Sequence, residues 1–288
     1  MSDVKLEKPK IQPWRVSTDG NLTPPQKALL KTSSMMICMP AYGGQMSANC
    51  AKSIVEFYTE LALVGAKPSF FPLGNESLIQ RGRNTMAAMF LKTKFEYLMF
   101  IDSDIGFVPS QLCEMYLAAL KGQHKLVGAT YPKKFLNHNG IAAAVRSGKM
   151  PDDKIGHCGG DHAVRFNKTG ETLQYYDLNP VKYLPTGFLL IHRSVFEALE
   201  AKTTPFMVNT IPGEKDLVAR TWFDCPVEPN ADGSPGELLS EDWYFCKIAN
   251  EVGITPLYAP WVELRHYGTY GFHGCMFCSN GQYIHFQT

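Results

Sequence analysis

The chain has 288 residues, of which 45% are hydrophobic and 19% charged, and its formal net charge is +1. This composition is typical of a globular domain, and it gives no strong basic field of the kind that attracts nucleic acid. No apolar run approaches the roughly 18 residues that a membrane span needs. The polar, proline-interrupted start argues against a secretory signal, and the eight scattered cysteines are typical of a reduced protein. We therefore expect a cytoplasmic location.

Alternating apolar segments predict the architecture of the first half. Residues 1–31 carry four prolines, which favours an extended tail. Strand-like and helix-like patterns then follow in turn, with strands expected at 35–39, 68–73, 95–101 and 125–129 and helices at 47–65, 76–92 and 109–120. This order predicts an α/β fold with a mostly parallel sheet flanked by helices.

The second half is less regular. We expect a loop or hairpin at 133–162, a strand within 183–192, a short helix at 193–201 and a long loop at 202–238. Ser240 is a plausible N-cap of the next helix. The pattern indicates a single domain at 32–272 with a loop-rich second half, followed by a C-terminal tail at 273–288.

The most informative stretch is an apolar strand, YLMFI, that stops at Asp102 and Asp104. Carboxylates beside a buried strand are costly unless they are neutralised, and divalent cations such as Mg²⁺ and Mn²⁺ prefer their oxygens. In an extended chain the two side chains leave on one face, at a strand end where open sheets bind ligands. The alternative is a helix cap at Asp102 and a surface turn at Asp104.

Three further motifs accompany the aspartates: Arg81, Arg83 and Asn84 ahead of the strand, then SEDWYFC and ELRHYGTYGF. Their order resembles the nucleotide-sugar glycosyltransferases of the GT-A fold, and is similar to Anp1-like mannosyltransferases and to glycosyltransferases of large viruses and phages. The resemblance spans roughly 33–272. It implies a Rossmann-like sheet, a nucleotide-sugar-binding half at 32–132 and an acceptor-binding half at 133–272. A viral origin would place the protein in the host cytoplasm.

The resemblance also implies a bound Mn²⁺ or Mg²⁺ ion, held by Asp102, Asp104 and His266. A diphosphate leaving group needs a cation to neutralise the charge that develops on departure. Asp104 would bind the ion directly, whereas Asp102 would contact the ribose or reach the ion through water. The alternative for His266 is a partly buried histidine with a structural role.

Arg81 and Arg83 lie two apart on a helix, so only one of them is expected to face the site. Arg83 is the better candidate for the diphosphate, because a guanidinium suits phosphate geometry. Tyr42 could stack on the base, and Gly187 could let the sugar approach the backbone. The expected donor-binding residues are Pro40, Ala41, Tyr42, Arg83, Asp102, Ser103, Thr186 and Gly187.

Glu241 and Asp242 are the candidate catalytic residues. In inverting members of the fold a carboxylate at this helix start takes the proton of the acceptor hydroxyl. Anp1-like enzymes retain the anomeric configuration, so Asp242 could instead position the acceptor. Acidic residues in a first helical turn also occur without catalysis, because they complement the helix dipole.

The resemblance, together with these residues, implies a metal-dependent hexosyl- or pentosyltransferase that uses a UDP- or GDP-sugar. The hydroxyl acceptor could be a glycan, a protein or a hydroxylated base in viral DNA, for which a local basic surface is available at Lys133, Lys134, Arg146, Lys149 and Lys154. A nucleotidyltransferase should carry a basic residue in the glycine-rich loop after the first strand, and this loop lacks one. A non-catalytic sugar-nucleotide-binding protein would not need Asp242. A single Cys275-x-x-Cys278 pair argues against structural zinc.

Overall fold

The computed structural model describes residues 15–16, 21–168, 173–209, 211, 214, 216–230 and 232–274. Its helices are α1 (Pro24–Thr32), η1 (Tyr42–Gly44), α2 (Ala48–Leu63), α3 (Ile79–Leu91), α4 (Pro109–Gly122), α5 (His138–Ser147), η2 (Asp152–Gly159), α6 (Arg193–Ala198), η3 (Glu200–Lys202) and α7 (Glu241–Glu251). No helix in these ranges is long and apolar enough to cross a membrane.

The strands alternate with these helices through the first half of the chain. They are β1 (Met35–Ala41), β2 (Ser69–Gly74), β3 (Tyr97–Ile101), β4 (Ile105–Phe107), β5 (Leu126–Gly128), β6 (Asn179–Pro180), β7 (Phe188–His192), β8 (Pro205–Val208), β9 (Leu217–Arg220), β10 (Val227–Glu228), β11 (Glu237–Leu238), β12 (Leu257–Tyr258), β13 (Leu264–Tyr267) and β14 (Gly271–His273).

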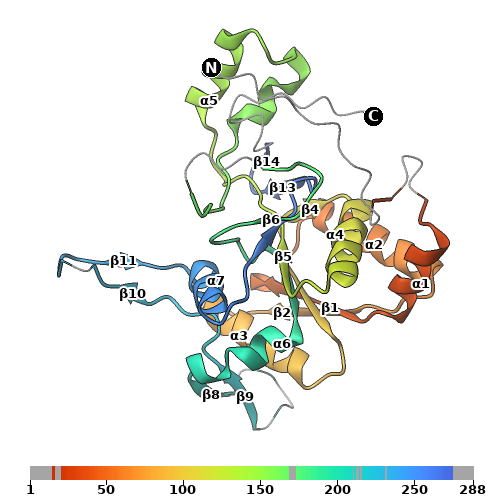
Figure 1. Cartoon of the computed structure of the whole chain (residues 1–288), viewed down its shortest axis with the longest axis vertical. Helices are drawn as coiled ribbons and strands as arrows, with labels where there is room; N and C mark the ends of the chain where they lie inside the picture. The colour runs from red at the N-terminus through yellow and green to blue at the C-terminus, as the bar shows by residue number, and fades with distance from the viewer. Residues whose placement is uncertain are drawn as a thin grey trace.

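Seven strands form the central sheet in the order β2-β1-β3-β7-β5-β12-β6 (Figure 1). Strands β2, β1, β3, β5 and β12 run in one direction, and β7 and β6 run against it. The prediction of an α/β fold with a mostly parallel sheet is therefore confirmed. The antiparallel strand β7 lies between β3 and β5, so its start lies beside the end of β3.

Helices cover both faces of this sheet because its strands are apolar on both sides. In β1, Met35, Ile37 and Met39 face a core that α2 and α4 complete, whereas Met36 and Cys38 face a second core made with α3, α6 and α7. Successive side chains of a strand point to opposite faces, so one continuous apolar strand serves both cores. Figure 1 shows α2 and α4 on one side of the sheet and α3 and α6 on the other.

A second, three-stranded sheet has the order β14-β13-β4. Its strand β4 begins directly after the aspartate turn and pairs antiparallel with β13, and this register sets His266 opposite Ile105. The backbone N–H of Tyr267 also donates to the carbonyl oxygen of Asp104, at 2.8 Å. This pairing brings a segment 160 residues later in the chain beside the two aspartates.

The structure differs from the predicted extended tail at residues 1–31. Pro24–Thr32 form α1, whose N-cap Thr23 accepts a hydrogen bond from the Gln26 backbone while the Gln26 side chain accepts one from the Thr23 backbone. This reciprocal capping box, with proline in the first turn, is readable in the sequence TPPQ. The prolines therefore mark the start of a helix here rather than an extended chain.

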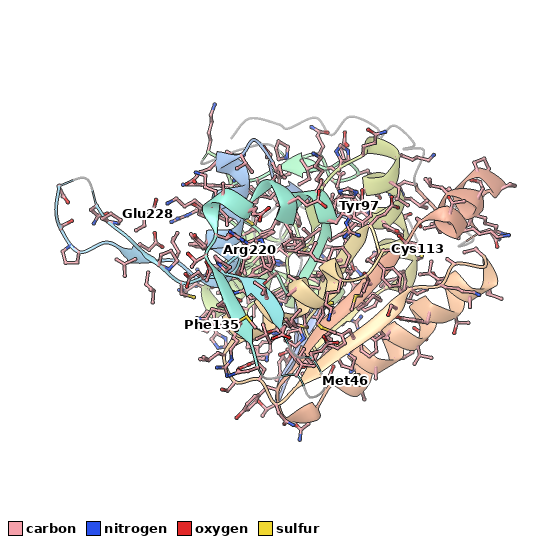
Figure 2. All side chains as sticks on the ribbon, turned by 90° about the horizontal axis from the view of Figure 1, so that it is seen from below. Met46, Tyr97, Cys113, Phe135, Arg220 and Glu228 are labelled. Carbon is pink, nitrogen blue, oxygen red and sulfur yellow. The ribbon has the colours of Figure 1, made fainter. Side chains whose placement is uncertain are left out.

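The irregular segments of the second half also contain more structure than expected. The predicted loop at 133–162 contains α5 and η2, and the predicted loop at 202–238 contains two hairpins, β8–β9 and β10–β11. The β10–β11 hairpin, which carries Glu228, projects away from the rest of the molecule (Figures 1 and 2). Residues 275–288, with Cys275 and Cys278, lie outside the described residues.

Candidate active site

Arg83 lies at the centre of the candidate site. Its side chain is 3% exposed, its Nη2 lies 3.0 Å from Asp102 Oδ1, and its Nε lies 3.3 Å from Glu241 Oε1. Burial acts to lower the pKa of Arg83, but the charges of Asp102 and Glu241 outweigh it and raise that pKa. One buried guanidinium therefore joins α3, the end of β3 and the start of α7.

The neighbours of Arg83 in the motif have different surroundings. The Asn84 amide donates to the carbonyl of Phe223 at 2.8 Å and accepts from the Phe223 N–H at 2.9 Å, so it fixes the chain beside α3. Arg81 points to the surface, where its Nε lies 2.6 Å from Glu76 Oε2. The two arginines thus face opposite surroundings, as their spacing predicts.

Asp102 and Asp104 lie in a turn rather than in an extended chain, since the Ile105 N–H donates to the Asp102 carbonyl at 3.0 Å. Asp102 faces Arg83, and Asp104 faces Lys134, whose Nζ lies 2.5 Å from Asp104 Oδ2. The turn brings both carboxylates to one region but gives each its own partner. The expectation that they share one face holds only for an extended chain.

The different surroundings of Asp102 and Asp104 shift their pKa values in opposite directions. Burial, opposed by Arg83, raises the pKa of Asp102, and the nearby charge of Asp104 raises it further. Burial also acts to raise the pKa of Asp104, but hydrogen bonds from His266 and Lys134 lower it below the ordinary value. Asp104 is thereby kept ionised, as a metal ligand must be.

His266 faces Asp104 from β13. Its Nδ1 lies 3.0 Å from the carbonyl oxygen of Pro132, and its Nε2 lies 3.4 Å from Asp104 Oδ2. A carbonyl only accepts hydrogen bonds, so Nδ1 donates to Pro132 and Nε2 is the ring nitrogen that faces Asp104. Metal-binding histidines are commonly oriented by such a hydrogen bond on the far nitrogen.

The donor atoms at this point suit a divalent cation, with one carboxylate oxygen and one imidazole nitrogen close together. The described part of the chain contains no group of three or more His, Cys, Asp or Glu side chains arranged to hold a metal. Such a pair fits an ion of the Mg²⁺ type, which binds one or two carboxylates and completes its shell with substrate phosphates and water.

Asp242 lies in the first turn of α7. Ser240 occupies the N-cap position with extended backbone, but its hydroxyl donates to Asp242 Oδ1 instead of capping the helix. The Trp243 N–H donates to the same oxygen at 2.8 Å. Burial, followed by the charge of Glu241, raises the pKa of Asp242 to about 6. A carboxylate with this pKa is suited to accept a proton near neutral pH.

Tyr131 was not singled out in the sequence, although it follows the end of β5. Its ring makes an edge contact with His266, with 5.0 Å between ring centroids. A Cβ added to Gly187 would lie 2.4 Å from the Tyr131 hydroxyl and 2.6 Å from Asp102 Oδ2. Gly187 is therefore required to let Tyr131 and Asp102 approach the backbone of the chain just before β7.

Buried polar atoms without a hydrogen-bond partner among the described residues include Arg83 Nη1, Thr130 Oγ1 and Thr186 Oγ1. Buried polar groups are rarely left unpaired without a functional reason.

The loop after β1 adjoins the same region, because the Ser47 N–H donates to the carbonyl of Ser103 at 2.8 Å. Pro40, which is partly buried, and Ala41, which is buried, are the last residues of β1, and Tyr42, at the start of η1, is 71% exposed.

No family model and no curated protein sequence matches this chain. Among solved structures, the chain is similar to one described as "Crystal Structure of A197 from STIV", with a TM-score of 0.43 and 14% sequence identity. The match covers 84% of this chain and 94% of that one. Similarity at this level identifies neither a family nor an activity.

Proposed function

We propose that the protein is a metal-dependent glycosyltransferase of the GT-A type, which moves a sugar from a UDP- or GDP-sugar to a hydroxyl acceptor. The observation that supports this most is a cluster of four carboxylates: Arg83 pairs with Asp102 and Glu241, and the charges of Asp104 and Glu241 act on Asp102 and Asp242 respectively. They come together where β3 ends, and ligands of open sheets bind at strand ends.

The charges of this cluster favour a divalent cation. Four carboxylates contribute −4, and Arg83 and Lys134 contribute +2, so the net charge is −2 once Asp242 is ionised. A divalent cation would offset this negative charge, and a diphosphate would bring further need for positive charge. Asp104 and His266 would hold the ion, which would supply charge neutralisation to the leaving diphosphate.

The chain's own residues would do the remaining work. Arg83 holds Asp102 and Glu241 in place, and Asp102 would contact the ribose. Asp242 would take the proton of the acceptor hydroxyl, because its pKa of about 6 leaves it ionised at neutral pH. Direct attack by that hydroxyl inverts the anomeric carbon; in a retaining enzyme Asp242 would position the acceptor instead.

The test is a screen of sugar nucleotides for Mn²⁺-dependent hydrolysis without acceptor, followed by Asp242→Asn. We expect Asp242→Asn to keep donor affinity and to reduce turnover by about 10²–10⁴-fold, the usual contribution of a general base. Asp232→Asn, at a fully exposed carboxylate of the β10–β11 hairpin, is the matched control. Lost donor affinity with normal turnover at saturation would move Asp242 to the donor site.

The pH dependence of turnover is a second test of the role of Asp242. Asp242 acts as a base only when it is deprotonated, so turnover should fall as the pH drops below about 6. The control variant should keep this acid limb, and Asp242→Asn should lose it. A limb that persists in Asp242→Asn would belong to another group.

A further inference from the structure

Lys134 occupies the position that the proposed metal ion would need. Its Nζ lies 2.5 Å from Asp104 Oδ2, the same oxygen that lies 3.4 Å from His266 Nε2. Both members of the pair border solvent, since the side chains of Lys134 and Asp104 are 41% and 33% exposed. A soluble cation can therefore reach Asp104 without opening the core.

The chain segment that carries Lys134 is tied to the site at several points. Pro132 accepts the hydrogen bond that orients His266, at 3.0 Å. The aliphatic part of the Lys134 side chain packs beside Gly268, since a Cβ added to that glycine would lie 3.5 Å from Lys134 Cδ. The Lys133 N–H donates to the carbonyl of Asp161 at 2.7 Å, which joins this segment to the chain just after η2.

We propose that Lys134 is the built-in counterion of Asp104 and that a divalent cation binds by displacing it. This inference rests on the metal site of the proposed function. An ammonium group and a metal ion cannot both lie against one carboxylate oxygen without strong repulsion between them. Binding of the ion therefore requires the ammonium to leave. The apparent metal affinity is the intrinsic affinity multiplied by the fraction of molecules in which Lys134 has left Asp104.

The exchange has a structural consequence outside the metal site. Once released, Lys134 no longer holds the 133–135 segment against Asp104. That segment leads into α5 and η2, the part of the chain that includes Arg146, Lys149 and Lys154. Metal binding would thus loosen the connection between β5 and α5. Phe135, which is 57% exposed and labelled in Figure 2, follows Lys134 directly.

Calorimetric titration with Mn²⁺ alone, without nucleotide, tests the exchange. Lys134→Met keeps most of the length of the side chain and removes its charge, so we expect Mn²⁺ to bind it about twofold to fivefold more tightly than wild type, as for loss of a partly exposed ion pair. Lys133→Met is the matched control, since Lys133 has the same charge and an exposed position. Unchanged or weaker binding to Lys134→Met, or equal gains in both variants, would overturn the proposal.

Hydrogen exchange provides a second measurement that does not depend on activity. Mn²⁺ should speed exchange of the 133–136 amides in wild type and leave it unchanged in Lys134→Met. Slower hydrogen exchange in wild type would contradict displacement.

The two proposals can fail separately. If Mn²⁺ binds Lys134→Met more tightly than wild type but no sugar nucleotide binds, glycosyl transfer is wrong and the displacement of Lys134 by the ion stands. If sugar nucleotides bind but Mn²⁺ does not, the exchange is wrong and a donor site remains.

Discussion

Asp102 and Asp104 are separated by one residue and have contrasting surroundings. Asp102 is held by Arg83, whose side chain is 3% exposed and also pairs with Glu241. Asp104 is held by Lys134, whose side chain is 41% exposed. A buried guanidinium with two carboxylate partners cannot leave without stranding charge, whereas an exposed ammonium exchanges readily with solvent cations. The contrast indicates a fixed half of the site, Arg83 with its carboxylate partners, beside an exchangeable half, Lys134 with Asp104.

The largest effect expected from this contrast is on stability. Among the described residues, Arg83 is the one cation that pairs with Asp102 and Glu241, so Arg83→Met leaves two partly buried carboxylates without it. Breaking one side of a buried ion pair costs about 3–5 kcal/mol, so we expect the free energy of unfolding to fall by that amount. Urea denaturation measures it, with Lys134→Met as the exposed counterpart. A loss below about 1 kcal/mol would show that Arg83 is not the fixed element.

Replacing Asp242 should raise the free energy of unfolding, whereas replacing Arg83 should lower it. Its folded pKa of about 6 lies above the ordinary value of 3.8, so the folded state binds the proton more tightly than the unfolded state. Ionised Asp242 therefore costs stability above pH 6, and this cost disappears as the pH falls below about 4. Asp242→Asn should raise the free energy of unfolding by about 1–3 kcal/mol at pH 8, since one pKa unit corresponds to 1.36 kcal/mol.

Thermal denaturation of wild type and Asp242→Asn at pH 8 and pH 4 checks this prediction. The melting temperatures should differ at pH 8, with the variant higher, and should converge at pH 4. A carboxylate retained at a cost to stability is expected where the group serves function. If the variant is less stable at both values, Asp242 serves mainly to support α7.

The exchangeable half should respond in metal binding rather than in stability. Asp104→Asn and His266→Ala each remove one proposed ligand, so each should weaken Mn²⁺ binding by at least about tenfold, or 1.4 kcal/mol. Calorimetry with Mn²⁺, beside a thermal melt of the same samples, separates the two roles of His266. A variant that melts early but titrates like wild type would show that His266 only supports the packing of β13 on β4.

The parts of the fold that follow from local patterns were predictable. The YLMFI strand, the aspartates at its end and the helix with Arg81 and Arg83 are all readable within a few residues. The opposite facing of the two arginines also follows from helical spacing alone. These features needed no knowledge of distant contacts.

The remaining features depend on contacts between distant parts of the chain. Strand β7 enters the sheet antiparallel between β3 and β5, and a strand pattern does not state its direction. The pairing of Lys134 with Asp104 joins residues 30 apart, and that of Arg83 with Glu241 joins residues 158 apart. Tyr131 carries no motif, and its place beside His266 and Gly187 follows from β5 and β13.

The smallest effect is expected at Arg81, two residues from Arg83 on the same helix. Arg81 makes a close ion pair with Glu76, at 2.6 Å; the Arg81 side chain is 44% exposed and the Glu76 side chain 6% exposed. Water solvates Arg81, and Glu76 keeps a hydrogen bond from the Leu78 N–H, so the pair should contribute about 0–1 kcal/mol. We expect Arg81→Met to lower the free energy of unfolding by less than about 1 kcal/mol and to leave donor and Mn²⁺ binding unchanged. Arg83→Met should instead lower the free energy of unfolding by about 3–5 kcal/mol. A comparable loss at both positions would show that the burial of Arg83 between Asp102 and Glu241 does not distinguish the two arginines.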